Sequence, residues 1–272
     1  MSISPAQTRL ICSELEALAA RERITILWAC ESGSRAWGFE STDSDFDVRF
    51  IYLRRGEDYL RVSPMRDVIE VPISGDLDFS GWDLTKALRL LRKSNPPLIE
   101  WMQSPFVYSQ HPEFRMGFWN LCERYFCPRS CMHHYLSMAD RNRRSYLRAD
   151  TIKLKRYFYM LRPLLAAQWL KNHGTIVPME FRVLLDEMLP RGEVRELIDD
   201  LLERKRAGFE LGEAPAIPAL SDFINQEFES FGGAEKTAEY TKPWEPLDTY
   251  FQSLLCSLED NTKPLEINRQ PL

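Results

Sequence analysis

Hydrophobic and polar positions change their period several times along the N-terminal part of the chain, and each change predicts an element. Apolar residues recur at helical spacing through 5–22, whereas the uninterrupted apolar run at 24–30 is typical of a buried strand. Polar and apolar residues alternate over 45–50, which indicates a half-buried strand at 45–53. The elements expected in this part are a helix at 5–22, strands at 24–30, 45–53 and 67–73, a hairpin partner at 76–82 and a helix at 84–94.

Polar and proline residues delimit the next elements, and the remainder of the chain is helical. Asp83 fits the N-cap of the helix at 84–94, and Asn95-Pro96-Pro97 stops that helix. The further helices expected are 111–124, 129–148, 151–172, 179–188, 193–207 and two more before 258. The pattern predicts an α+β fold with a mixed sheet domain at 1–125, followed by an all-helical C-terminal domain at 126–272.

Composition places the chain among globular proteins. It has 272 residues, of which 44% are hydrophobic, so it can bury a substantial core. No apolar run approaches the ~20 residues needed to cross a bilayer. Charges occur throughout the N-terminal segment, which lacks the hydrophobic region of a signal peptide. We therefore expect a cytoplasmic protein without a membrane partner. The net charge of −5 excludes a global basic footprint for nucleic acid.

One local stretch is strongly basic. Between Arg141 and Arg162 only Asp150 opposes a set of eight cationic side chains. They are Arg141, Arg143, Arg144, Arg148, Lys153, Lys155, Arg156 and Arg162. Such a run is usually a solvated helix face. Interleaved aromatic residues, Tyr146 and Tyr159 among them, slightly favour a surface that contacts phosphates or bases.

The cysteines are expected to be free thiols. The chain has six, and without an export signal disulfides are not favoured. Three of them cluster with two histidines, in the order Cys122, Cys127, Cys131, His133 and His134. The spacing C-x4-C-x3-C-x-H-H differs from the C-x2-C pairs of zinc fingers and ribbons. Small apolar side chains on a helix are the favoured interpretation, with a zinc site as the alternative.

A Gly-Ser turn followed by two alternating aspartates carries the candidate chemistry. Gly33 and Ser34 follow the first predicted strand, where backbone N–H groups and a hydroxyl can face a phosphate. Asp45 and Asp47, two residues apart on the next strand, point to the same side. Carboxylates so placed are hard oxygen ligands for one or two Mg²⁺ ions. Arg49 shares their face and would pair with Asp47 or add positive charge nearby.

A third carboxylate is expected from a neighbouring strand, where it would help to hold the metal that lowers the pKa of an attacking hydroxyl. Asp76 and Asp78 both lie on the open face of 76–82, since Leu77 and Phe79 would face the core. Periodicity does not separate the two aspartates. Asp-x-Asp alone is usually a solvated strand or turn, and only the ordered combination with the Gly-Ser turn points to a site.

These motifs resemble a known family. Gly33-Ser34 with Asp45-Phe46-Asp47 resembles the signature of DNA-polymerase-β-type nucleotidyltransferases, and GSRAWGFESTDSDFDVRFIY is similar to the RlaP-type branch that genome context associates with RNA repair. The resemblance spans about residues 25–170. It continues through DFSGWDLTK with Asp78, Asp83 and Lys86, NPPLIEW with Asn95, Pro96 and Glu100, HHYLSMADRN, and KLKRYFYMLRPLLA.

The resemblance implies a palm-like αβ domain, a nucleoside triphosphate and two Mg²⁺ ions, which Mn²⁺ can replace. Asp45 and Asp47 would hold both ions, and Asp78 would hold the catalytic ion and help to deprotonate the acceptor hydroxyl. Asp78 is favoured over Asp76 because the family places its acidic residue five positions before the helix cap, here Asp83. In addition, Asp76 directly follows a glycine, where carboxylates often serve a turn.

The same resemblance implies a nucleotide site. Gly33 and Ser34 would bind the triphosphate, and Arg35 would add positive charge beside it. By analogy with other helical domains of the superfamily, Lys155 and Tyr159 would contact phosphate or base, since they are one helical turn apart. The alternative is that Tyr159 packs in the core and Lys155 is solvated.

Three functions are compatible with these patterns. The first is an enzyme that transfers a nucleoside monophosphate from an NTP to a hydroxyl of RNA, of a protein or of a small molecule, with release of pyrophosphate. The second is a non-catalytic nucleotide- or RNA-binding regulatory module of the same fold. The intact set of carboxylates argues against this second function. The third is a structural metal protein built on the Cys/His cluster.

Overall fold

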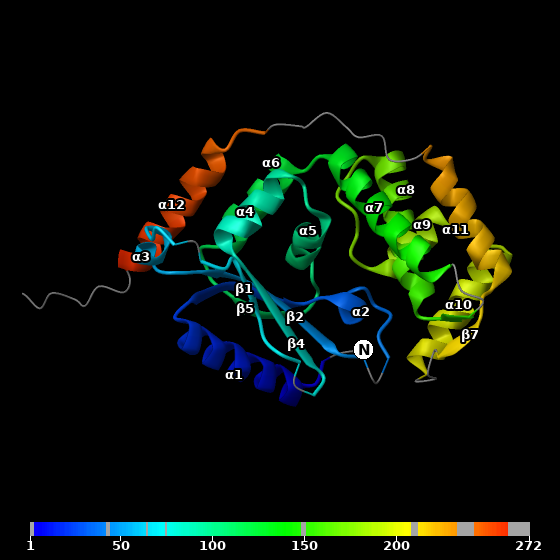
Figure 1. The fold of residues 1–272 in the computed structure, drawn as a ribbon, viewed down its shortest axis with the longest axis horizontal. Coiled ribbons are helices and arrows are strands. Elements are labelled where there is room, and N and C mark those ends of the chain that lie inside the picture. Colours follow the sequence, from blue (N-terminus) through cyan, green and yellow to red (C-terminus); the bar gives the residue numbers. More distant parts are fainter. Residues whose placement is uncertain are drawn as a thin grey trace, which may run out of the picture.

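The computed structural model describes residues 3–41, 44–63, 65–73, 75–147, 151–207, 212–232 and 242–260. Its N-terminal part is a five-stranded mixed sheet flanked by helices (Figure 1), which confirms the α+β class. The elements there are α1 (Pro5–Glu22), β1 (Thr25–Glu31), α2 (Gly33–Ala36), β2 (Phe46–Leu53), α3 (Gly56–Tyr59), β3 (Val68–Glu70), β4 (Leu77–Asp83), α4 (Leu84–Arg92), α5 (Pro96–Met102), β5 (Val107–Gln110) and α6 (Arg115–Tyr125).

The strand order is β3-β4-β2-β1-β5, and only the pair β2–β4 is parallel. The predicted hairpin between 67–73 and 76–82 is confirmed as the antiparallel pair β3–β4. Parallel pairing of β2 and β4 brings the beginnings of both strands to the same edge of the sheet. The polar residues at those beginnings are therefore neighbours.

Each face of the sheet has its own core. On one face, α1 places Ile11, Leu15 and Leu18 against Val48 and Phe50 of β2. The opposite face is covered by α4, α5 and α6 (Figure 1). Alternation along β2 therefore buries residues on both sides in its second half, whereas its first half leaves one face open.

Local capping explains where the helices of this part begin. The Asp83 carboxylate accepts from Thr85 N–H at 2.8 Å, which confirms the predicted N-cap of α4. Asn95 caps α5, so the Asn-Pro-Pro segment both ends one helix and opens another. The sequence patterns did not predict α5 or β5, because elements this short offer too few periods to recognise.

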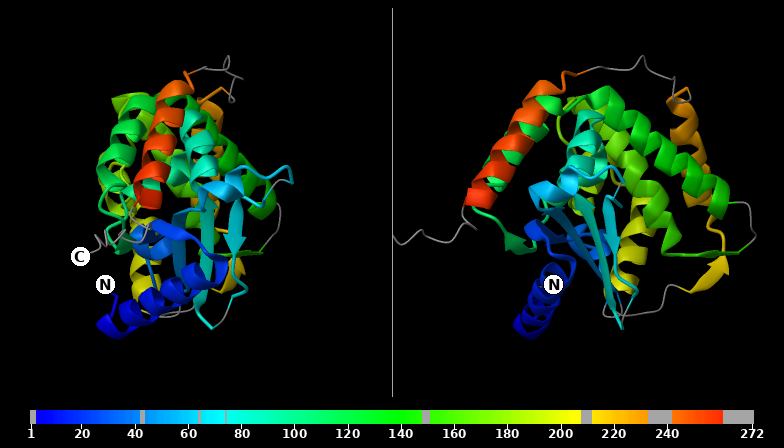
Figure 2. Two further views of the ribbon diagram at one scale, coloured as in Figure 1. Left: turned by 90° about the vertical axis from the view of Figure 1, so that its left-hand side faces the viewer. Right: turned by 60° about the vertical axis from the view of Figure 1, so that its left-hand side comes forward.

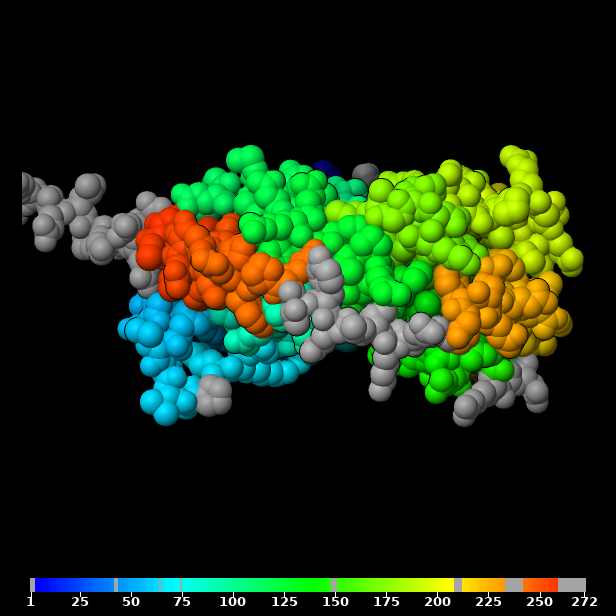
Figure 3. Space-filling model, turned by 90° about the horizontal axis from the view of Figure 1, so that it is seen from above, coloured from blue at the N-terminus to red at the C-terminus, as the bar shows by residue number. Residues whose placement is uncertain are grey.

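The C-terminal part is a bundle of helices with one short sheet. Its elements are α7 (Pro128–Tyr146), β6 (Thr151–Lys153), α8 (Arg156–His173), α9 (Phe181–Met188), α10 (Glu193–Arg206), β7 (Glu213–Pro215), α11 (Pro218–Ser230) and α12 (Glu245–Asp260). The helix expected at 151–172 begins at Arg156, since 151–153 pair with β7 as a strand. Seen from above, α12 and α11 lie at opposite ends of the helix-covered face (Figure 3).

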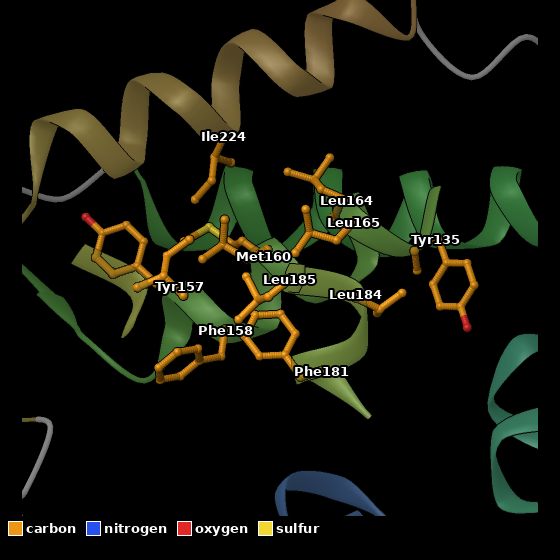
Figure 4. Close-up of a cluster of buried hydrophobic side chains, with 14 of the residues drawn as sticks. Tyr135, Tyr157, Phe158, Met160, Leu164, Leu165, Phe181, Leu184, Leu185 and Ile224 are labelled. Carbon is orange, nitrogen blue, oxygen red and sulfur yellow. The ribbon is translucent and has the colours of Figure 1, made fainter. Parts of the chain in front are cut away.

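The core of the bundle forms around α8, most of whose residues are buried. Phe158 and Leu165 of α8 meet Phe181 and Leu185 of α9 and Ile224 of α11 (Figure 4). In contrast, α12 lies apart from α11 on the side of the sheet part (Figure 2). Its Leu247 and Leu254 belong to the core that α4 and α6 help to form. The division at 125/126 stays a prediction, and the last helix returns to the sheet part.

A buried carboxylate joins the two parts of the molecule. Glu100 of α5 is 6% exposed. Its Oε1 accepts from Arg162 Nη1 of α8 at 2.9 Å and from the Tyr135 hydroxyl of α7 at 2.6 Å. Its Oε2 accepts from the Trp37 indole N–H at 3.3 Å. Arg162 also donates to the Met179 carbonyl at 3.2 Å, so both charges are paired and hydrogen-bonded.

Two further findings concern the chain as a whole. All six cysteines are free thiols, as the sequence predicted. In the described part of the chain, no helix combines the length and the apolar character that a membrane crossing requires.

We expect Glu100→Gln to lower the free energy of unfolding by about 3–5 kcal/mol, because it leaves the Arg162 charge buried without a counter-charge. The double variant Glu100→Gln/Arg162→Met should cost less than the sum of the single changes, since no unpaired charge remains. Urea unfolding followed by circular dichroism measures all three variants. A cost below about 1 kcal/mol for Glu100→Gln would contradict the assigned role.

Candidate active site

The candidate site lies at the sheet edge where β2 and β4 begin. The short helix α2 flanks it, between the sheet and the helical bundle (Figure 1). The aromatic rings of Trp37, which follows α2, and Tyr159 of α8 meet edge to face with centroids 6.1 Å apart. The structure therefore brings motifs from both halves of the chain to one place.

The turn after β1 places Gly33 directly against Asp47. Ser32 N–H donates to the Asp47 carbonyl at 2.8 Å, which ties the turn to β2. Gly33 has φ of +58°, and a Cβ built there would lie 1.9 Å from Asp47 Oδ2. Only glycine fits this position, because the backbone is left-handed and the carboxylate occupies the side-chain space.

Asp47 and Asp78 stand opposite each other on the parallel strands. The Arg49 guanidinium joins them, with Nη2 at 2.9 Å from Asp47 Oδ1 and at 2.7 Å from Asp78 Oδ2. Burial raises the pKa of Asp47, and the charges of Asp78 and Asp45 act in the same direction while Arg49 opposes them. The two carboxylates are thus held close together, and a cation relieves the electrostatic repulsion between them.

The register separates the two candidates for the third carboxylate. β4 begins at Leu77, so Asp78 lies within the strand and Asp76 lies in the preceding turn. Asp76 is exposed, and its carbonyl accepts from Phe46 N–H at 2.7 Å. Asp45 is exposed immediately before β2. Of the two alternatives, Asp78 is therefore the one beside Asp47.

The sequence patterns did not single out Glu31, which lies fully buried beneath the site. Its Oε1 accepts from Asp47 N–H at 3.0 Å and its Oε2 accepts from the Tyr108 hydroxyl at 2.5 Å. Burial raises the pKa of Glu31 to about 7, opposed by these hydrogen bonds. The only signal in the sequence is an acidic residue at the end of an apolar strand. Its contacts make it a support for the Asp47 backbone.

Arg35 is engaged with the loop that carries it. Its Nη2 donates to the Ser44 carbonyl at 2.5 Å, and its guanidinium carbon lies 3.9 Å from the centroid of the Phe46 ring. Arg35 Nε also lies 4.0 Å from Glu31 Oε1. These contacts hold the segment that leads into Asp45, and a contact of Arg35 with nucleotide stays a prediction.

Tyr159 of α8 lies close enough to Asp47 and Asp45 to be affected by their charges. It is 39% exposed. Burial raises the pKa of Tyr159, and the charges of Asp47 and Asp45 raise it further. The ring packs edge to face against Trp37, and a contact of Tyr159 with phosphate or base stays a prediction.

Lys205 is a cation at the site that the sequence patterns missed. It belongs to the last turn of α10, is 8% exposed, and places Nζ 3.4 Å from Ser44 Oγ. Burial lowers the pKa of Lys205 to about 8, and the charges of Lys155 and Arg35 act in the same direction while Glu40 opposes them. Lys155 is exposed at the start of α8. Lys155 and Arg35 thus lie within electrostatic range of Lys205, which contacts Ser44 in the segment that leads into Asp45.

The donor set at the sheet edge suits a hard divalent ion in its chemistry, since it consists of carboxylates. Within the described ranges, however, no three Asp, Glu, His or Cys side chains converge as a group that could hold a metal ion. Asp47 and Asp78 each turn one oxygen toward Arg49, which takes up the space between them. Metal binding there stays a prediction.

Two members of the Cys/His cluster lie in different cores, and no metal-holding group of three Asp, Glu, His or Cys side chains is found among the described residues. Cys122 of α6 is buried in the core that α4, α5 and α6 form over the sheet, whereas Cys131 is buried in the helical core and its thiol donates to the Ser94 carbonyl at 3.1 Å. His134 is partly buried, and burial lowers its pKa. The structure agrees with small side chains packed on helices.

The basic stretch between Arg141 and Arg162 does not form one surface. Arg162 is buried against Glu100, Arg144 pairs with Asp140 at 2.6 Å, and Lys153 points outward from β6. Arg148 and Asp150 lie outside the described residues. Of this stretch, Lys155 is the cation that neighbours the candidate site through Lys205.

Two comparisons with known proteins find matches over most of the chain, and one of them names a family. The model of the RlaP family, described as the RNA repair pathway DNA polymerase beta family, matches residues 8–253. The uncharacterised protein YcgL of Bacillus subtilis (strain 168) is 45% identical over 232 residues, which cover 85% of this chain and 89% of that protein. The family match includes the Gly-Ser turn, the sheet aspartates and the helical bundle.

We expect Gly33→Ala to abolish divalent-ion-dependent nucleotide binding, because the new Cβ would displace the Asp47 carboxylate. Gly38→Ala is the matched control, since Gly38 also has a positive φ (+79°) but nothing lies within 4 Å of its Cβ position. Both variants should lose about 1–2 kcal/mol of stability from the left-handed backbone. Calorimetric titration with nucleotide and Mn²⁺ distinguishes them, and equal binding by the two variants would contradict the contact.

Proposed function

This chain belongs to the RNA repair pathway DNA polymerase beta family, and from that membership we propose that it is a metal-dependent nucleotidyltransferase. It transfers a nucleoside monophosphate from an NTP to a hydroxyl acceptor and releases pyrophosphate. The observation that carries the proposal is the register of the sheet, which sets Asp47 opposite Asp78 with Gly33 packed against the same carboxylate.

The proposed metal ligands are Asp45, Asp47 and Asp78. When bound, Mg²⁺ or Mn²⁺ neutralises charge on the phosphates and lowers the pKa of the attacking hydroxyl. Among the protein groups, Asp78 is proposed to orient the acceptor hydroxyl and to help accept its proton, which its position opposite Asp47 on the parallel strand supports. Glu31 supports this arrangement from below by holding the Asp47 backbone.

The triphosphate is proposed to lie between the Gly-Ser turn and the helical bundle. Gly33 and Ser34 begin α2, where backbone N–H groups are available to phosphate oxygens. Lys155 and Lys205 are proposed to supply positive charge to the triphosphate, which their mutual proximity supports. Tyr159 offers an aromatic face to the base or the ribose. The low pKa of Lys205 follows from burial beside like charges, and an anion there would relieve that repulsion.

RNA is the proposed acceptor, because the family description assigns its members to an RNA repair pathway. The direct experiment is incubation of the protein with each labelled NTP, with Mg²⁺ or Mn²⁺, and with tRNA, short RNA or protein acceptors. Transfer of label to RNA supports the proposal. Transfer of label to protein would show that the acceptor is a protein and not RNA. Tight nucleotide or RNA binding without transfer to any acceptor would instead support the non-catalytic regulatory module.

We expect Asp78→Ala to slow the chemical step by at least ~100-fold, the low end for loss of an acid–base group. Asp76→Ala is the matched control and should cost little, because its side chain is exposed in the turn before β4. Single-turnover kinetics with the acceptor, or Mn²⁺-supported self-labelling, measures both variants. An inactive Asp76→Ala beside an active Asp78→Ala would overturn the assignment.

We expect Lys205→Met to weaken NTP binding tenfold or more, since a hydrogen bond to a charged group contributes about 1.5–3 kcal/mol. Lys153→Met is the control, because Lys153 is an exposed lysine on the nearby strand β6. Titration calorimetry with NTP and Mg²⁺ gives both affinities. If the two variants bind equally well, the phosphates lie elsewhere.

A further inference from the structure

Arg49 is held between the two sheet aspartates through both of its terminal nitrogens. Nη2 donates to Asp47 Oδ1 at 2.9 Å and to Asp78 Oδ2 at 2.7 Å. Nη1 donates to the Asp78 carbonyl at 2.9 Å and to the Val48 carbonyl at 3.1 Å. The guanidinium is thus fixed by backbone and side-chain acceptors together, and 19% of the side chain is exposed.

The contacts use the planar fork of an arginine. A guanidinium reaches two carboxylates and two carbonyls at once, which a lysine ammonium cannot do with the same geometry. Within the described ranges, neither Asp47 nor Asp78 makes an ion pair with any other side chain. One protein cation therefore serves both carboxylates that the proposed function gives to the metal.

A divalent ion at these carboxylates must share them with that fixed positive charge. Arg49 uses Asp47 Oδ1, while Asp47 Oδ2 faces Gly33. Two cations on the same pair of carboxylates repel each other. The repulsion is stronger at a partly buried site than in bulk water, because solvent and salt screen the charges less there. Arg49 must therefore lower the affinity of the site for an ion that arrives alone.

We propose that Arg49 is the resident counter-ion of the carboxylate site and makes occupation by a divalent ion depend on the nucleoside triphosphate. This rests on the proposed nucleotidyl transfer at the same site. A metal–triphosphate complex carries net negative charge, so Arg49, Lys155 and Lys205 attract it, whereas they repel the free ion. The nucleotide and the ion thereby bind cooperatively, and the two carboxylates stay aligned between turnovers.

A purely aligning role predicts the opposite effect. If Arg49 only held Asp47 and Asp78 in place, its removal would disorder the ligands and weaken metal binding. If it acts as a counter-ion, its removal leaves two carboxylates in need of a cation and strengthens metal binding. The sign of the change in metal affinity therefore decides between the two roles.

The test is calorimetric titration of the full chain with Mn²⁺ in the absence of nucleotide. We expect Arg49→Gln to bind Mn²⁺ at least tenfold more tightly than the wild type, which corresponds to about 1.4 kcal/mol. Arg49→Lys should stay closer to the wild type, because the charge is kept. Arg66→Gln removes an exposed arginine that pairs with Glu70 away from the site, and should leave Mn²⁺ affinity unchanged.

A second measurement uses a non-hydrolysable ATP analogue. The analogue should raise Mn²⁺ affinity by a larger factor in the wild type than in Arg49→Gln, since the variant no longer repels the free ion. Thermal unfolding gives an independent readout, because Mn²⁺ should raise the melting temperature of Arg49→Gln more than that of the wild type. Arg49→Met is a second charge-free variant for use if Arg49→Gln folds poorly.

Unchanged or weaker Mn²⁺ binding in a folded charge-free variant would overturn the proposal and leave Arg49 an aligning residue. Asp78→Asn separates this failure from that of the proposed function. If Asp78→Asn weakens Mn²⁺ binding, the ion binds at the carboxylates and only the role of Arg49 is in question. If Asp78→Asn leaves Mn²⁺ affinity unchanged, both in the otherwise wild-type protein and in the Arg49→Gln variant, the ion binds elsewhere and both proposals are wrong.

Discussion

The arrangement of the whole molecule depends on one buried carboxylate, Glu100. A buried charge is tolerated only when it is paired and its remaining lone pairs accept hydrogen bonds. The donors to Glu100 come from three separate segments, with Trp37 after α2, Tyr135 on α7 and Arg162 on α8. Satisfying this single group therefore fixes the sheet part, the Gly-Ser loop and the helical bundle relative to one another.

The loop between β1 and β2 consequently belongs to both parts. Phe39 packs in the helical core, where its ring stacks on Phe158 with centroids 5.1 Å apart. Phe181 N–H donates to the Trp37 carbonyl at 2.9 Å, and Arg206 of α10 donates to the Gly38 carbonyl at 2.8 Å. The bundle thus holds the loop that carries the Gly33-Ser34 turn, and Gly33 contacts Asp47. In the proposed enzyme, changes in the bundle would reach the site through this loop.

The electrostatics of the site are divided between the two parts. The sheet supplies the carboxylates, together with Arg49 between Asp47 and Asp78, whereas the bundle supplies Lys155 and Lys205. A metal–triphosphate complex has the matching division of charge, with a cation at one side and phosphate oxygens at the other. This correspondence gives the proposed function its physical basis, and it explains why a protein of net charge −5 can still attract an anionic substrate locally.

The sequence by itself determined whatever depends on neighbours along the chain. Helical and strand periods and the Asp83 cap follow from local spacing, because capping and side-chain alternation act over a few residues. The tertiary structure decided the rest. Asp76 and Asp78 share a period, and only the pairing of β4 with β2 places Asp78 opposite Asp47.

Residues whose burial and pKa depend on contacts remote in sequence could likewise not be recognised from the sequence pattern. Glu31 and Lys205 look like ordinary charged residues until burial and neighbours far along the chain change their pKa. Cys122 and Cys131 form a cluster in the sequence, but in the folded chain they are packed in two different cores. Burial and strand register are set by contacts between segments remote in sequence, so no local pattern records them.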